Sequence, residues 1–173
     1  MILTQFVMAA IMTMTPIHMG HHGHGLQEVG VVIGFHIAAM YLPSPLTGIL
    51  VDKLGRTTMA IASGVTLLAS GLVAAFAPVG SMPLLILALV LLGLGWNFGL
   101  ISGTALIIDS THHLCAKTQG SVDVLFALSG AAGGGLSGMV VAHSSYAALS
   151  LSGATLSLVL IPVVVWSRKT QSR

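Results

Sequence analysis

The chain has 173 residues, of which 55% are hydrophobic and only 6% are charged, and its formal net charge is +2. A soluble domain carries roughly 25% charged residues, so this composition excludes a water-soluble fold and indicates a membrane protein. The small positive charge argues against a nucleic-acid-binding surface, and a lone cysteine excludes an internal disulfide framework.

Six long apolar stretches follow one another along the chain. About 20 apolar residues cross the hydrocarbon core as a helix, and lipid forces backbone groups to pair within helices. We therefore expect an all-α membrane protein with a single domain over residues 1–173. Its six transmembrane helices are predicted at residues 2–17, 29–51, 59–77, 84–108, 121–141 and 146–166. Pro43 and Pro45 interrupt the second stretch.

Four histidines lie in the predicted loop after the first helix, which spans residues 18–27: His18, His21, His22 and His24. Imidazole suits zinc, copper and nickel, but a structural site needs four firmly held ligands. Three glycines make this loop flexible. We expect a weakly chelating loop rather than a specific metal site.

All lysines and arginines fall in gaps that share one side of the six stretches: Lys53, Arg56, Lys117, Arg168, Lys169 and Arg173. Cytoplasmic loops accumulate Lys and Arg. This pattern predicts a multi-pass protein of the cytoplasmic membrane, with both termini inside the cell and the histidine loop outside.

Small residues repeat at four-residue spacing inside several stretches, which stacks them on one helix face and favours close helix packing. The repeats are Gly30/Gly34, Gly95/Gly99/Gly103 and Gly130/Gly134/Gly138.

Polar side chains inside the predicted helices are functional candidates, because burying them in lipid is costly. For Asn97, lining a cavity and bonding two helices together remain open alternatives. His36, whose imidazole titrates near neutral pH, and Asp123 are candidates for proton coupling. The alternatives are a packing role for His36 and an interfacial charge pair with Lys117 for Asp123.

The segment after the second stretch reads Gly48-Ile-Leu-Val-Asp52-Lys53-Leu-Gly55-Arg56. It resembles the G-x-L-x-D-[RK]-x-G-[RK] loop of the major facilitator superfamily, although Thr57 stands where that family usually has a further basic residue. Gly55 suits a tight turn, and Asp52 with Arg56 is expected to form a charge network that joins helices at the inner face.

Members of that family have twelve helices in two six-helix halves, so this chain matches half of the fold. It looks most like the second, C-terminal half, because residues 13–19 with the histidines at 21–24 resemble helix seven of bacterial members, and residues 96–99 resemble helix ten. The resemblance implies a substrate cavity, for which the candidates are Gln5, Thr13, His36, Trp96 and Asn97. It also implies three partners: the lipid bilayer, a small-molecule substrate, and either a missing first half or a second copy.

The implied function is secondary active transport of a small solute, with proton-coupled efflux as the expected form and no cofactor. No phosphate-binding G-x-x-x-x-G-K-[ST] loop is present, so ATP is not expected to drive transport through this chain. The alternative is a non-transporting membrane module, either a metal-binding subunit that uses the histidine loop or an inactive remnant.

One short segment of the sequence resembles an enzyme motif. Residues 135–138 match the G-x-S-G of rhomboid intramembrane proteases, which require a histidine base on a later helix. The histidine that follows, His143, lies just past the same predicted helix. We therefore interpret the match as a coincidence and expect no enzyme.

Overall fold

The computed structural model describes residues 1–78, 81–110 and 115–171, with side chains described except at positions 110, 115–117 and 165–171. Within these ranges the chain is helical and contains no strand. The helices are α1 (Ile2–His21), α2 (Leu26–Tyr41), α3 (Ser44–Leu54), α4 (Arg56–Phe76), α5 (Met82–Ser110), α6 (Cys115–His143) and α7 (Tyr146–Gln171). The prediction of an all-α membrane protein is confirmed.

Five of these helices are long and apolar enough to cross a membrane, and α2 with α3 forms a sixth candidate bent by 41°. The bend lies where the sequence has Pro43 and Pro45. Proline lacks an N–H and restricts the residue before it, so α2 ends at Tyr41 and Pro45 falls in the first turn of α3. The predicted helix 29–51 is thus two helices.

The connections between helices are shorter than predicted. α1 continues through His18 to His21, so residues 22–25 join it to α2, where the sequence suggested a loop at 18–27. In the same way α5 runs to Ser110 and α6 begins at Cys115. Backbone hydrogen bonding carries a helix past the end of its apolar stretch, and hydropathy does not report that continuation.

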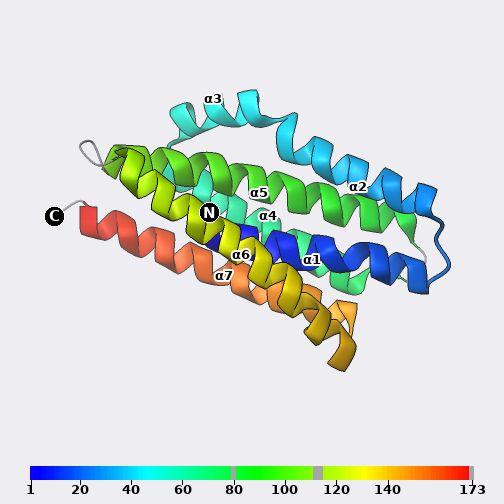
Figure 1. Ribbon diagram of the computed structural model, residues 1–173. Helices are drawn as coiled ribbons and strands as arrows, with labels where there is room; N and C mark the ends of the chain where they lie inside the picture. The colour runs from blue at the N-terminus through cyan, green and yellow to red at the C-terminus, as the bar shows by residue number, and fades with distance from the viewer. Residues whose placement is uncertain (79–80, 111–114, 172–173) are drawn as a thin grey trace.

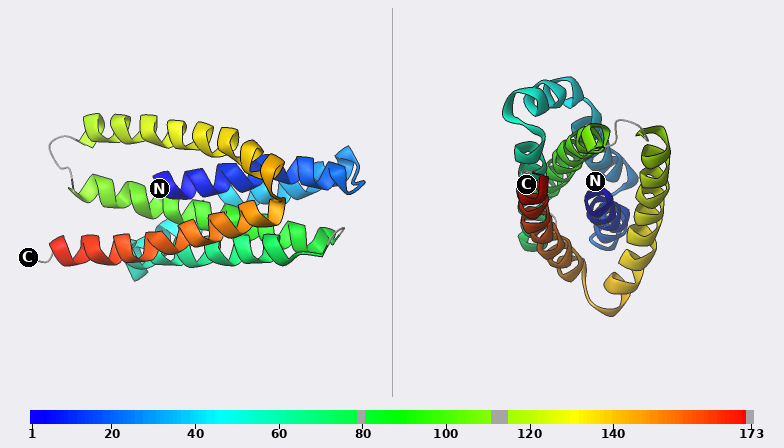
Figure 2. Two further views of the ribbon diagram at one scale, coloured as in Figure 1. Left: turned by 90° about the horizontal axis from the view of Figure 1, so that it is seen from below. Right: turned by 90° about the vertical axis from the view of Figure 1, so that its left-hand side faces the viewer.

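The helices lie side by side, with α1 between α6 on one side and α4 and α7 on the other (Figures 1 and 2). The α2–α3 pair runs along α5. The α1–α2 and α6–α7 connections lie at one end of the bundle, together with the end of α4 and the start of α5 (Figure 1). The α3–α4 turn lies at the other end, together with the end of α5, the start of α6 and the end of α7. This second end carries Lys53, Arg56 and the helix ends that contain Lys117, Arg168 and Lys169. Arg173 lies outside the described residues.

Glycines and serines set the closest contacts around α4. A Cβ placed on Gly71 would come within 2.7 Å of the Ser150 carbonyl oxygen of α7. Toward α5, the Ser63 hydroxyl donates to the Gly95 carbonyl oxygen at 2.6 Å, and the Ser70 hydroxyl donates to that of Ala88 at 2.8 Å. Close approach of the helix backbones and these serine hydrogen bonds therefore hold α4 between α5 and α7.

The predicted glycine repeats divide into two groups. Those of α5 and α6 face neighbouring helices: added Cβ atoms would meet Leu67 from Gly95 and Gln5 from Gly130, for example. Gly30 and Gly34 of α2 have nothing within 4 Å among the described residues. Close packing is confirmed for α5 and α6, whereas the α2 pair lies on an open face.

Candidate functional site

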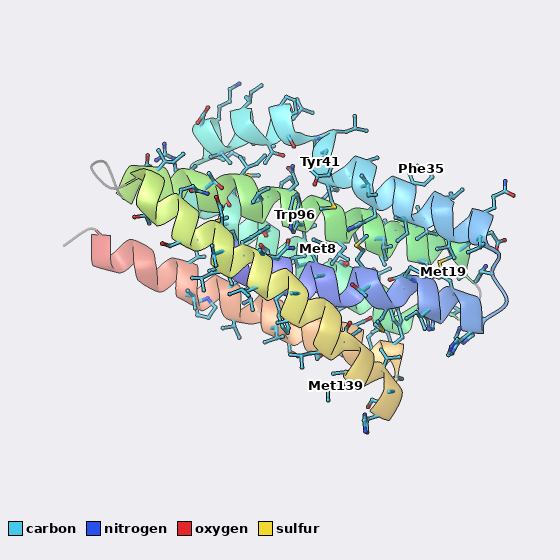
Figure 3. All side chains as sticks on the ribbon, in the orientation of Figure 1. Met8, Met19, Phe35, Tyr41, Trp96 and Met139 are labelled. Atoms are coloured by element: carbon cyan, nitrogen blue, oxygen red, sulfur yellow. The ribbon has the colours of Figure 1, made fainter. Side chains whose placement is uncertain are left out.

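Trp96 stands at the meeting point of four helices. Its indole N–H donates to Gln5 Oε1 on α1 at 2.6 Å. Its ring lies 5.8 Å from that of Tyr41, edge to face, and 6.3 Å from that of Phe126 on α6. Trp96 is only 5% exposed, whereas Tyr41 is 60% exposed, and Figure 3 shows the two residues close together. This polar–aromatic cluster (Gln5, Tyr41, Trp96 and Phe126) joins α1, α2, α5 and α6.

Asn97, the next residue on α5, is 1% exposed. Its Nδ2 donates to the Met40 carbonyl oxygen at 2.7 Å and to Ser44 Oγ at 2.8 Å. Its Oδ1 accepts a hydrogen bond from Thr47 Oγ1 at 2.6 Å. The amide therefore fastens α5 to the break between α2 and α3. Of the two predicted roles, this arrangement matches the bond between helices.

His36 of α2 is completely buried against α5. Its Nδ1 donates to the Leu89 carbonyl oxygen at 2.8 Å. Its other ring nitrogen, Nε2, is buried and makes no hydrogen bond to any described residue. His36 is thus held by one nitrogen, while the second remains a free acceptor.

Thr13 and Asp123 lie on exposed surfaces. The Thr13 hydroxyl donates to the Ala9 carbonyl oxygen of its own helix at 2.6 Å. Asp123 accepts from Gln119 Nε2 at 2.8 Å, and the side chain of its predicted partner, Lys117, lies outside the described part of the chain. Neither residue joins the cluster around Trp96.

The motif loop forms a sharp turn between α3 and α4. Gly55 has φ +90°, a left-handed conformation that favours glycine, which confirms the predicted tight turn. Arg56 forms its ion pair with Asp109 at the end of α5. Asp52 is exposed and has no ion pair within the described residues, and the same holds for the neighbouring Lys53. Gly48 lies on an open helix face.

The predicted pairing of Arg56 with Asp52 is therefore wrong. Asp52 belongs to α3, which ends at Leu54, whereas Arg56 begins α4 after the turn. The turn directs Arg56 toward α5, whose end brings Asp109 into contact.

The four histidines separate into two environments. His18 stacks on Tyr146 at 4.3 Å between ring centroids, and the ring of His22 lies 4.4 Å from that of His18. His24 instead donates from Nδ1 to Glu28 at 2.7 Å. No group of three potential metal ligands gathers in the described ranges. Because α1 continues to His21, His18, His21 and His22 share one helix face and line one pocket beside Tyr146, whereas His24 is engaged with Glu28. The predicted set of four is thus divided between these two places.

The two residues of the protease-like match are each bonded within their own helix. The Ser137 hydroxyl donates to the Gly134 carbonyl oxygen at 2.6 Å, and His143 Nδ1 donates to that of Met139 at 2.9 Å. This arrangement does not pair the serine with a base.

Sequence reasoning missed Tyr41, Phe126, Ser44 and Thr47. Aromatic residues are ordinary in apolar helices, so periodicity did not single out the first two. A signal for Ser44 and Thr47 was available in the sequence. Both lie beside the proline pair that marks the helix break, and polar residues at a helix break are natural partners for a buried amide.

Comparison with known proteins places the chain in a family. The model of the Major Facilitator Superfamily matches residues 1–173. The chain is 80% identical to the uncharacterized MFS-type transporter YddS of Bacillus subtilis strain 168 over 96% of its residues, and 75% identical to YdeG of the same organism over 97%. It is 32% identical over 92% of its residues to the riboflavin transporter RfnT of Brucella anthropi.

These alignments cover 38%, 39% and 40% of the relatives, so the chain spans about two fifths of their length. The match over every residue, together with the helical membrane fold and the motif turn at Gly55, gives one conclusion: this chain belongs to the major facilitator superfamily.

Proposed function

We propose that the chain forms the second six-helix half of a secondary transporter that moves a small solute across the cytoplasmic membrane, with both chain ends on the cytoplasmic side. The observation that carries this proposal is the polar–aromatic cluster on α1, α2, α5 and α6. Intramembrane polar groups are retained where they serve packing or a transport pathway. The family membership of the whole chain and the names of its relatives favour transport over a non-transporting membrane module.

The same cluster favours a flat aromatic solute. Tyr41 offers an exposed ring beside the indole of Trp96, and aromatic rings attract one another in stacked and edge-to-face arrangements. Gln5 adds an amide to the same surface. A relative aligned along nearly the whole chain is named a riboflavin transporter, which makes riboflavin a suitable probe.

The proposal includes a partner, because one half supplies one wall of a transport cavity. α6 is the least covered helix: 11% of the residues in its apolar stretch are buried, against 50% in α5. We propose that a first half, or a second copy of the chain, covers the exposed surface beside α1 and α6. Rocking of the two halves would then expose the solute to each side in turn, coupled to movement of protons.

The experiment replaces the matching segment of the Bacillus subtilis relative YddS with residues 1–173 and measures riboflavin uptake into vesicles by fluorescence. The isolated chain and unaltered YddS are measured in parallel. We expect uptake by the hybrid and by YddS, and none by a monomer of the isolated chain. A silent hybrid beside an active YddS would contradict the transport role, and silence of both would contradict riboflavin as the solute class.

Tyr41→Ala tests the aromatic surface in the hybrid, with Phe76→Ala as the matched control. Both residues are exposed aromatics at helix ends, with Phe76 74% exposed on α4. Loss of an aromatic contact of about 0.5–1.5 kcal/mol reduces binding by roughly 2- to 13-fold. Uptake at low riboflavin should fall by that factor in Tyr41→Ala and stay unchanged in the control. Equal rates in both variants would remove Tyr41 from the site.

A further inference from the structure

His36 holds one proton in a defined position. A carbonyl oxygen only accepts hydrogen bonds, so the 2.8 Å contact with Leu89 requires the proton of the neutral imidazole to lie on Nδ1. Nε2 then carries the lone pair. It is buried and without a hydrogen-bond partner in the described residues, and an unpaired acceptor inside a protein calls for an explanation.

On the described helices packed against His36, no side chain is placed to balance a second proton. By sequence, α1 has no ionisable side chain from Ile2 to Ile17, and α5 has none from Met82 to Ile108; these are the helices in contact with α2. On α2 itself, Glu28 is engaged with His24, and Tyr41 lies at the exposed end.

The backbones of α2 and α5 also touch at this level. A Cβ added to Gly93 would come within 2.6 Å of the His36 carbonyl oxygen. An imidazolium is a donor at both nitrogens, and in this arrangement its Nε2–H would face neither an acceptor nor a counter-charge. Protonation is therefore favoured only where α2 stands away from α5.

A hinge for that separation lies one turn further along. α2 ends at Tyr41, the chain bends by 41°, and Asn97 bonds to both sides of the break. The last turn of α2 and the start of α3 thus remain attached to α5, and the part of α2 that precedes Met40 pivots about this point.

We propose that His36 Nε2 is the proton-binding site of this transporter half, and that it takes up a proton when α2 separates from α5 and releases it when the two helices close. This inference rests on the proposed transport function and names its coupling site. The proton comes from water that reaches the opened interface and leaves Nδ1–H in place, so the imidazole alternates between neutral and singly charged. Because proton binding and opening are linked, each favours the other.

The test uses the purified chain in lipid nanodiscs and requires no solute. Nitrogen NMR of histidine-labelled protein reports the tautomer and charge of each ring, and the His36 signal is assigned by its loss in His36→Gln. Spin labels at Phe35→Cys and Leu87→Cys, in a Cys115→Ser background, report the α2–α5 distance. These positions are 52% and 46% exposed, and Phe35 is marked on α2 in Figure 3.

We expect the Nδ1–H tautomer at alkaline pH, and protonation of His36 as the sample is acidified stepwise. The distance between labels should increase with the same midpoint. His36→Gln should abolish the pH-dependent shift, whereas His143→Gln, at the exposed end of α6, should retain it.

Three results would overturn the proposal: an Nε2–H tautomer, protonation without a change in distance, or the same distance change in His36→Gln. The first two are read from the wild-type side chain, so they decide the matter even if the variant fails to fold. A failure here leaves the riboflavin assay unaffected, and a silent hybrid transporter leaves the titration of His36 standing, so the two proposals fail separately.

Discussion

At the scale of single residues, the side chains of α5 show how a buried polar group acquires its role. Asn97 uses both ends of its amide to bond with the break between α2 and α3. The neighbouring Trp96 uses its one donor toward Gln5. Adjacent residues on a helix point in directions about 100° apart, so one amide fastens a helix break while the next side chain contributes to an aromatic surface.

We predict that Asn97→Ala lowers the free energy of unfolding by about 1–3 kcal/mol, because buried polar groups of α2 and α3 lose their partner. Ser102→Ala is the control: Ser102 is also buried on α5, but it bonds to the Phe98 carbonyl oxygen of its own helix. Its loss should cost less than about 0.6 kcal/mol. Unfolding in mixed detergent micelles measures both values. Equal costs would show that the contacts of Asn97 between helices add nothing.

The ion pair of Arg56 with Asp109 yields a second prediction. Both side chains are partly exposed, at 36% and 46%, so water screens their attraction. A double-mutant cycle with Arg56→Ala and Asp109→Ala should give a coupling energy of about 0.2–1 kcal/mol. The matched cycle, which combines Arg56→Ala with Asp52→Ala, should give a coupling energy near zero. Stronger coupling to Asp52 would restore the pairing that the sequence suggested.

At the scale of helices, close approach of backbones decides which surfaces meet. Gly71 of α4 faces α7 with no room for a side chain, whereas Gly30 of α2 has open space around it. The same residue type therefore has opposite consequences in the two helices. In α4 the missing Cβ allows contact between helices, and in α2 it leaves a flexible residue in a helix interior.

Alanine substitution should separate these two cases. Gly71→Ala forces a Cβ against the Ser150 carbonyl oxygen and the Ala154 side chain, and such overpacking costs about 1–3 kcal/mol. Gly30→Ala should instead stabilise by about 0.5–1 kcal/mol, because alanine favours the helix. The two unfolding free energies should thus shift in opposite directions. A stabilised Gly71→Ala would mean that α4 and α7 do not approach as described.

At the scale of the whole molecule, the lysines and arginines of the described residues lie at one end of the bundle. The α3–α4 turn, the start of α6 and the end of α7 share that end, and the opposite end carries the histidines at the close of α1 (Figure 1). A membrane that retains Lys and Arg on its cytoplasmic side would therefore orient the whole bundle.

Reporter fusions test this orientation. We predict that reporters placed in the turn after Asp52 and after Arg173 are active on the cytoplasmic side, and that a tag after His21 is accessible from outside. Exchange of Lys53 and Arg56 for glutamine should weaken the preference for this orientation, because fewer positive charges are then retained on the cytoplasmic side. A C-terminal reporter outside the cell would contradict both the orientation and the proposed alignment of this chain with a second transporter half.

The sequence by itself determined the class of protein, the positions of most helices and the turn at Gly55. Hydropathy is a property of a short segment, and so is the need for a left-handed residue in a tight turn. Both can be evaluated without knowing which other segments pack against that segment. The proline pair also marked where the second stretch is interrupted, although it did not show two separate helices.

Only the tertiary structure decided which residues meet. The partner of Arg56, the bonds of Asn97 and the free Nε2 of His36 depend on contacts across about 50 residues of sequence. Such contacts depend on how each helix is rotated and shifted along its neighbour. In a chain this apolar nearly every helix face is hydrophobic, so periodicity does not reveal that rotation.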